Sequence, residues 1–78
     1  MTDEIEKKIY EVFQKVHELG IVHNDIRPEN ILVSWKENSV WLIDFEFAQA
    51  GDEYTSRLER DAVTELIAQV KNGESVPL

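Results

Sequence analysis

The sequence contains no cysteine, no long hydrophobic run and only three glycines, and each of these shortages excludes a class of protein or site. A chain without cysteine has no disulfide framework and no thiolate metal site. Its longest apolar runs are a few residues long, whereas a helix that crosses a membrane needs about 20. The three glycines lie far apart, so no glycine-rich phosphate-binding loop is present. Because the charged residues 1–8 also do not resemble a secretory signal, we expect a cytoplasmic protein that makes no contact with membranes.

Basic residues are also few. Eight lysines and arginines stand against 16 aspartates and glutamates, which gives a formal net charge of −8. An acidic surface repels polyanions unless a basic patch intervenes, and no such patch is visible, so we do not expect a nucleic acid partner. A chain of 78 residues allows one domain at most and buries a smaller share of its surface than an average domain. We therefore expect a marginal core.

Residues 3–19 have the pattern of a helix with one apolar side. The apolar residues recur at intervals of three and four, which is the helical repeat. They are Ile5, Ile9, Val12, Phe13, Val16 and Leu19. Asp3 and Glu6 suit the start of a helix, and Gly20 suits its end because glycine enters the left-handed conformation at little cost.

After this helix, the pattern predicts a loop, a hairpin and a second helix. Residues 23–30 are polar and contain Pro28, which indicates a loop. Residues 31–35 and 40–44 are rich in β-branched and aromatic residues, which favours a β-hairpin that returns Asp44 to the end where Asn30 departs. An apolar stripe over residues 58–70 predicts the second helix, whose start is indicated by the capping-box spacing of Ser56 and Glu59; residues 74–78 are expected to form a loose tail. The expected class is α+β, in the order helix, loop, β-hairpin, helix.

Two motifs in this arrangement resemble known catalytic segments. His23-x-Asp25-x-x-x-x-Asn30 is followed fourteen residues later by Ile43-Asp44-Phe45, and together they resemble the catalytic loop and the metal-binding motif of the protein-kinase-like superfamily. The resemblance covers residues 8–70, the middle of the family's larger C-terminal lobe. It implies that residues 1–78 are a partial catalytic domain, because the glycine-rich loop and the lysine–glutamate pair of the N-terminal lobe are absent.

The resemblance also implies roles for individual residues. Asp25 orients the acceptor hydroxyl and takes its proton, while Asn30 and Asp44 hold the Mg²⁺ ions that bridge the phosphates of ATP. Carboxylate and amide oxygens are ligands that Mg²⁺ accepts. Arg27 stands where protein kinases usually have a lysine that reaches the transferred phosphate, and it keeps the charge with a different geometry. His23 is expected to support the loop structurally.

Some positions depart from the protein kinase pattern. Glu46 replaces the glycine of Asp-Phe-Gly, and residues 43–48 are closer to choline and ethanolamine kinases, relatives of the aminoglycoside phosphotransferases. We expect Glu46 to assist in binding the metal or to fix the motif in one state.

No Ala-Pro-Glu motif follows, which favours a small molecule or an atypical protein as the acceptor. Two alternatives are open for Asp61: by the resemblance it corresponds to the aspartate that begins the family's next large helix and braces the catalytic loop, or it is an ordinary solvated aspartate. Four aromatic residues are expected to pack in the core rather than stack on a nucleotide. They are Trp35, Trp41, Phe45 and Phe47.

Two functions follow from the resemblance, and a third does not depend on it. The first is a phosphotransferase, or part of one, that moves the γ-phosphoryl group of Mg·ATP to a hydroxyl of a protein or small molecule and needs a complementary N-terminal lobe or another protein. The alternative is an inactive kinase-derived fragment that acts as an interaction module or is a truncated gene product, because two helices and a hairpin leave apolar surface exposed. The third is an unrelated acidic α+β interaction domain in which the two motifs coincide by chance.

Overall fold

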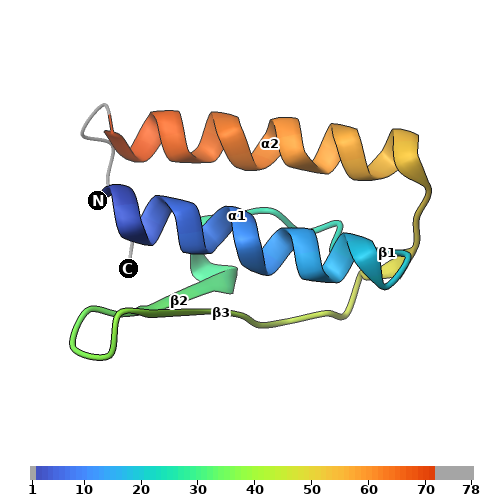
Figure 1. Cartoon of the computed structure of the whole chain (residues 1–78). Helices are drawn as coiled ribbons and strands as arrows, with labels where there is room; N and C mark the ends of the chain where they lie inside the picture. The colour runs from blue at the N-terminus through green and yellow to red at the C-terminus, as the bar shows by residue number, and fades with distance from the viewer. Residues whose placement is uncertain (1, 72–78) are drawn as a thin grey trace.

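The computed structural model describes residues 2–71, which form two helices and two small antiparallel sheets. The order is α1 (Asp3–Glu18), β1 (Ile21–Val22), a 3₁₀ turn (Pro28–Asn30), β2 (Ile31–Ser34), β3 (Ser39–Leu42), β4 (Gln49–Ala50) and α2 (Glu53–Lys71). In Figure 1, α1 lies between α2 and the hairpin of β2 and β3. The predicted α+β class and order of elements are confirmed, while the predicted tail lies outside the described residues.

Helix α1 forms the centre of the core. The Thr2 hydroxyl accepts a hydrogen bond from the amide of Ile5 at 3.2 Å and caps the first turn, while Gly20 has φ 77° just beyond the helix end, as predicted. The core is one cluster contributed by α1, β2 and α2. Its buried members are Ile5, Ile9, Phe13, Ile31, Val63 and Ile67. The 3.6-residue repeat of the sequence therefore identified the buried face of α1 correctly.

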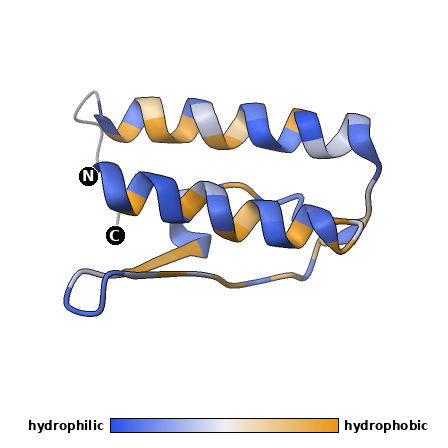
Figure 2. Ribbon diagram, viewed as in Figure 1, coloured by the Kyte–Doolittle hydropathy of each residue, from blue (hydrophilic) through white to orange (hydrophobic). Residues whose placement is uncertain are grey.

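The hairpin has one covered face and one open face. Ile31 pairs with Leu42 and Leu32 pairs with Trp41, and because side chains alternate between the faces of a strand, Ile31 and Leu42 point to the core while Leu32 and Trp41 point outward. Leu32 and Trp41 are each 46% exposed. Figure 2 shows hydrophobic residues along the hairpin and on the sides of the helices that face each other.

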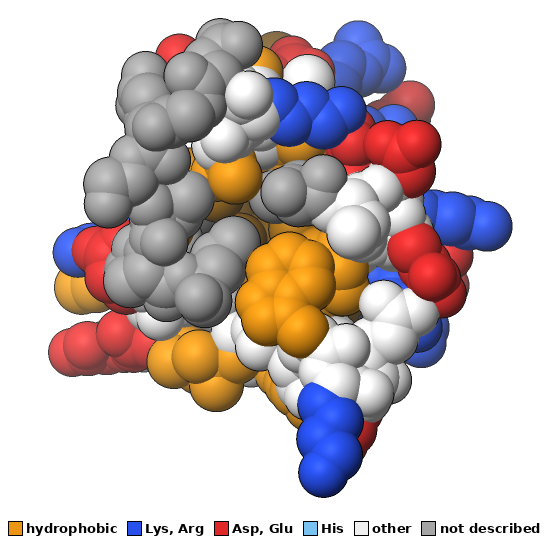
Figure 3. Space-filling view, turned by 90° about the vertical axis from the view of Figure 1, so that its left-hand side faces the viewer, with side chains coloured by type: hydrophobic (Ala, Val, Ile, Leu, Met, Phe, Trp, Pro, Cys, Tyr) orange, Lys and Arg blue, Asp and Glu red, His pale blue; other side chains and the backbone are white. Residues whose placement is uncertain are grey.

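The prediction that the four aromatic residues pack in the core is wrong. Their exposed fractions are 52% for Trp35, 46% for Trp41, 45% for Phe45 and 55% for Phe47. Trp41 is exposed because the hairpin packs on α1 with one face only, and no layer within residues 2–71 covers the other; Phe45 and Phe47 lie in the segment after β3, outside the hairpin. Figure 3 shows hydrophobic side chains open to the surface at the end of the molecule that holds the hairpin turn.

A second, smaller sheet closes the other end of the structure and was not predicted. Ile21 pairs with Ala50 and Val22 with Gln49. The next residue, Gly51, donates its amide to the carbonyl of Gly20 at 2.9 Å, and a Cβ at Gly51 would lie 2.7 Å from a methyl group of Val22. Two-residue strands have no periodicity that a sequence could reveal.

The N-cap of helix α2 (Glu53–Lys71) is Asp52, four residues before the predicted N-cap at Ser56. The Asp52 carboxylate accepts hydrogen bonds from the Thr55 amide, and the Thr55 hydroxyl accepts one from the Asp52 amide, both at 2.8 Å. This reciprocal pair is the N-cap, so the predicted capping box of Ser56 and Glu59 is wrong. Instead, Glu59 lies buried within the helix. Neither α1 nor α2, over the described residues, has the length and apolar character to span a membrane.

Candidate active site

The loop between β1 and β2 brings together three of the residues that the motif singled out. Arg27 donates its Nε–H to the Asp25 carboxylate at 2.8 Å, and Asn30 donates its side-chain amide to both the backbone carbonyl and the carboxylate of Asp25 at 2.9 Å. Pro28 begins the 3₁₀ turn that returns the chain toward Asp25, a position where a missing N–H costs nothing. The result is a carboxylate that is held from two sides and is only 11% exposed.

The charge on this carboxylate is stabilised by its neighbours. The hydrogen bond from Arg27 lowers the pKa of Asp25 below its ordinary value, with a further lowering from Asn30, while burial opposes both. The same hydrogen bond raises the pKa of Arg27, and the negative charge of Asp44 raises it further by a smaller amount. Asp25 is therefore ionised at neutral pH and can accept a hydrogen bond from a hydroxyl group.

Asp44 lies two residues beyond β3, the strand that pairs with β2. The amide of Ile43 donates to the carbonyl of Asn30 at 3.0 Å. Ile43 therefore lies opposite Asn30, and Asp44 is the next residue along the chain, so the hairpin returns Asp44 to the end where Asn30 departs, as the sequence predicted. Asp44 is exposed and has φ 60°, a conformation that aspartate tolerates better than most residues. Glu46 is also exposed and lies in the turn that follows.

The donor set fits a hard cation such as Mg²⁺. Asn30 uses its NH₂ group on Asp25, which leaves its amide oxygen without a hydrogen bond among the described residues. This oxygen and the exposed Asp44 carboxylate are the ligand types that Mg²⁺ takes from a protein when phosphate and water supply the rest. Residues 2–71 contain no cluster of three His, Cys, Asp or Glu side chains that could hold a metal.

A buried carboxylate on α2 holds the catalytic loop in place. Glu59 accepts hydrogen bonds from the backbone amides of His23 at 2.9 Å and Asn24 at 2.8 Å. Its Oε1 also lies 2.8 Å from Nε2 of His17 on α1, whose other ring nitrogen is buried without a hydrogen-bond partner among residues 2–71. Asp61 is exposed and Glu59 makes these contacts, so of the two alternatives for Asp61 the structure agrees with the solvated aspartate and not with the bracing role. The sequence did contain a signal: Glu59, Val63 and Ile67 are spaced by four on the buried face, where an acid is unusual.

His23 connects the loop to the hairpin. Its Nδ1 accepts from the amide of Asp25 at 3.2 Å, which leaves Nε2 as the protonated nitrogen that donates to the carbonyl of Ile43 at 2.8 Å. The ring is 1% exposed and packs edge-on against Phe45, with centroids 4.7 Å apart. Both ring nitrogens are used in these contacts, which supports the predicted structural role of His23.

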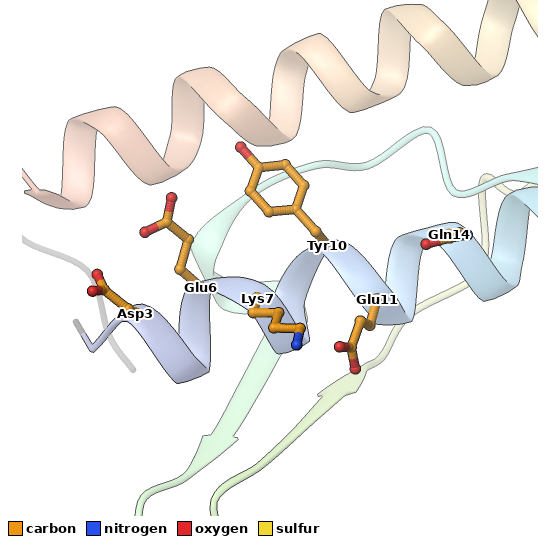
Figure 4. Close-up of a pocket in the computed structure, with 6 residues that line it drawn as sticks. All are labelled: Asp3, Glu6, Lys7, Tyr10, Glu11 and Gln14. Atoms are coloured by element: carbon orange, nitrogen blue, oxygen red, sulfur yellow. The ribbon is translucent and has the colours of Figure 1, made fainter.

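A surface hollow lies elsewhere on the molecule and shares no residue with this cluster. It has a volume of about 480 Å³ and runs along α1 (Figure 4). Its lining residues are Asp3, Glu6, Lys7, Tyr10, Glu11 and Gln14. Three of these six side chains are acidic and one is basic, so the net negative charge of the lining would repel a phosphate group. The hollow is therefore not part of the candidate active site.

Comparison with known proteins gives matches to kinases. The family model described as protein kinase domain matches residues 1–68. A probable serine/threonine-protein kinase of Corynebacterium efficiens is 36% identical over 61 residues, which cover 78% of this chain and 9% of that protein. The 3-deoxy-D-manno-octulosonic acid kinase of Vibrio vulnificus strain CMCP6 is 36% identical over 66 residues, with 77% of this chain and 28% of that protein covered.

A eukaryotic relative matches over a similar region. Cyclin-dependent kinase-like 2 of Pongo abelii is 35% identical over 82 aligned residues, which cover 92% of this chain and 16% of that protein. The chain thus spans less than a third of the length of these curated relatives. No solved structure gives a match.

Proposed function

Because this chain belongs to the protein kinase family, we propose that it is the catalytic-loop part of a kinase-like phosphotransferase that moves the γ-phosphoryl group of ATP to a hydroxyl group. One observation carries the proposal: Asp25 is held by Arg27 and Asn30 in direct contact, and the hairpin brings Asp44 beside Asn30. Phosphoryl transfer depends mainly on alignment and on neutralisation of charge, and these four side chains suit both tasks.

In this proposal, Asp25 orients the acceptor. Its ionised carboxylate accepts a hydrogen bond from the hydroxyl and takes the proton as the oxygen bonds to the γ-phosphorus and the bond to the bridging oxygen of ADP breaks. The Nε–H of Arg27 is occupied by Asp25, while its terminal NH₂ groups make no hydrogen bond within the described chain. These groups can approach the transferred phosphoryl oxygens, so Arg27 can stabilise both the base and the charge that develops.

The metal in this proposal is Mg²⁺, held by the Asn30 amide oxygen and the Asp44 carboxylate, with Glu46 as an additional oxygen ligand. Bound Mg²⁺ would neutralise charge on the phosphates of ATP. Glu46 is included because it is exposed two residues after Asp44. If Glu46→Gly leaves the Mg²⁺ affinity of an active assembly unchanged, this additional role is wrong.

The nucleotide needs more surface than this chain provides. Leu32, Trp41 and Ile43 are exposed and lie on the outward side of the hairpin beside Asn30 and Asp44. We propose that a complementary N-terminal lobe covers this face, because an adenine ring needs an enclosed apolar pocket that the hairpin alone cannot form. Without it, contacts to phosphate and metal alone should bind ATP weakly.

For the acceptor, we propose a small hydroxyl compound or an atypical protein, since the segment after Asp44 lacks the Ala-Pro-Glu motif. The matched relatives include one kinase named for a sugar acid and others named as protein kinases. We further propose a cytoplasmic location, where ATP is available and where a chain without cysteine loses nothing to reducing conditions.

A chimera tests the proposed function. Residues 1–68 would replace the matching segment of the Vibrio vulnificus 3-deoxy-D-manno-octulosonic acid kinase, and transfer from labelled ATP would be measured. We expect transfer that is lost on Asp25→Ala and on Asp44→Gly, a substitution that tolerates the positive φ of this position, but retained in Glu37→Ala at the hairpin turn. A chimera that unfolds cooperatively but transfers nothing, or one in which either aspartate variant keeps full activity, contradicts the proposal.

The second candidate is a kinase-derived interaction module, and the open face of the hairpin favours it. An apolar face that remains uncovered in a folded domain commonly marks an interaction site. Sedimentation at low concentration distinguishes the two readings. A monomer that unfolds cooperatively by itself argues against a module that depends on its partner, while self-association that Leu32→Ser and Trp41→Ser abolish supports it.

A further inference from the structure

Asn24 has an unusual backbone conformation beside the catalytic aspartate. Its φ is 67°, and the two other non-glycine residues with positive φ in the described chain are Asn38 at 54° and Asp44 at 60°. Such conformations are sterically costly for residues with a Cβ, and asparagine and aspartate bear the cost best. Two of the three therefore fall at the candidate active site, where surrounding contacts must hold them.

Asn24 makes two hydrogen bonds that point in different directions. Its backbone amide donates to Glu59 on α2 at 2.8 Å, and its side-chain amide donates to the carbonyl of Phe47 at 3.2 Å. The first bond anchors the loop to the core. The second reaches Phe47, in the segment that follows Asp44. Phe47 is 23 residues further along the chain than Asn24.

Residues 44–47 make no other hydrogen bond to the loop of residues 23–30 within the described chain, but the ring of Phe45 packs against His23, with centroids 4.7 Å apart. On the N-terminal side of this segment, Ile43 is fixed through bonds to Asn30 and His23. On its C-terminal side, the amide of Ala48 closes a turn onto the carbonyl of Phe45 at 3.0 Å, and Gln49 then pairs with Val22 of β1. The Asn24 side chain is thus the hydrogen bond that ties the far end of the segment to the catalytic loop.

We propose that Asn24 is a positioning residue that fixes the carboxylate of Asp44 relative to Asp25 and Asn30. This inference rests on the proposed function, since it concerns the same metal site. Asn24 does not touch the reacting atoms. It acts through the backbone of residues 44–47, and its left-handed conformation aims its side chain at Phe47 while its amide stays on Glu59.

The test compares two substitutions of the same kind. Asn24→Gly keeps the left-handed backbone accessible and removes only the side-chain donor. Asn38→Gly is the matched control, because Asn38 also has positive φ but its side chain makes no hydrogen bond within residues 2–71. Amide hydrogen exchange at residues 45–48 and Mg²⁺ titration, both followed by NMR on the 78-residue chain, report the tether and the metal site separately.

We expect Asn24→Gly to speed exchange at residues 45–48 and to weaken Mg²⁺ binding by roughly threefold to tenfold, the factor that one net hydrogen bond contributes. Asn38→Gly should change neither quantity. If exchange at residues 45–48 is the same in the wild type and in Asn24→Gly, the inference is wrong whatever the metal does. If the wild type binds no Mg²⁺ while exchange still responds to Asn24→Gly, the tether stands and the proposed function fails instead.

Discussion

At the scale of single residues, Glu59 connects the core to the chemistry. It is 6% exposed and accepts hydrogen bonds from two amides of the catalytic loop and from a histidine of α1. A buried carboxylate is tolerated when donors of this kind surround it, and it becomes costly when they are lost. The loop that carries Asp25 therefore takes its position from Glu59 on α2, which lies 36 residues beyond His23 and 35 beyond Asn24.

Substitution of Glu59 should destabilise the fold and loosen the loop. Glu59→Ala leaves the N–H of the buried His23 and the part-buried N–H of Asn24 without this acceptor, and a buried group left unpaired costs about 1–3 kcal/mol. We expect a loss of roughly 3 kcal/mol or more in urea unfolding, together with faster amide exchange at these two residues. Asp61→Ala, two positions away and exposed, should change unfolding by less than about 0.5 kcal/mol. Equal effects of the two substitutions would contradict the bracing role of Glu59.

The ion pair of Asp25 and Arg27 predicts a pH dependence. Contact with Arg27 lowers the pKa of Asp25 from its ordinary value of 3.8. A carboxyl group with a lowered folded-state pKa stabilises the fold above the unfolded-state pKa, and this contribution is lost as the pH falls through the folded-state pKa. NMR titration of the Asp25 carboxyl should therefore give a midpoint below 3.8. Arg27→Met should raise it, whereas Lys36→Met at the hairpin turn should not; a midpoint unmoved by Arg27→Met would show that the contact is absent in solution.

At the scale of elements, whether the sequence predicted a helix or strand depended on the length of that element. The sequence predicted α1 and the hairpin because each contains several repeats of its apolar pattern. It missed β1 and β4, which are two residues each and exist only because distant segments meet. The start of α2 was misplaced because Ser56 and Glu59 have the same spacing as the true cap, Asp52 and Thr55, and only the tertiary role of Glu59 distinguishes the two pairs.

The position of this cap can be tested directly. Asp52→Ala removes the acceptor for the Thr55 amide and should cost about 1 kcal/mol in thermal or urea unfolding, as is typical for an N-cap. Ser56→Ala should cost much less, because Ser56 lies inside the helix and its amide already bonds to the carbonyl of Asp52. A larger loss for Ser56→Ala than for Asp52→Ala would return the start of the helix to the position that the sequence suggested.

The same comparison applies to the site. Asp25, Asn30 and Asp44 could be placed together from sequence, since the hairpin pattern alone brings Asp44 back beside Asn30. The supporting contacts could not. The bond of Asn24 to Phe47 and the bonds of Glu59 to the loop depend on a left-handed backbone and on the packing of α2, and neither leaves a local pattern. The aromatic residues were misplaced because hydrophobic character alone does not say whether a covering layer exists.

At the scale of the whole molecule, two helices and a hairpin place the catalytic loop on a small core and leave one sheet face open. The outward Leu32 and Trp41 lie on the same hairpin that carries Asn30 and Asp44 toward each other. The described chain therefore holds the phosphate side of the proposed site without the apolar enclosure that a nucleotide base requires. This arrangement predicts weak but specific binding of Mg·ATP through its phosphates.

The most direct test is the thermal unfolding of the 78-residue chain with and without Mg·ATP at millimolar concentration, beside Asp44→Gly. A ligand that binds only the folded state raises the midpoint in proportion to RT ln(1 + [L]/Kd). The account predicts a cooperative transition, a small saturable upward shift for the wild type and no shift for Asp44→Gly. An unshifted wild type, or an equal shift in both proteins, would contradict the claim that these residues form a site for Mg²⁺ and phosphate.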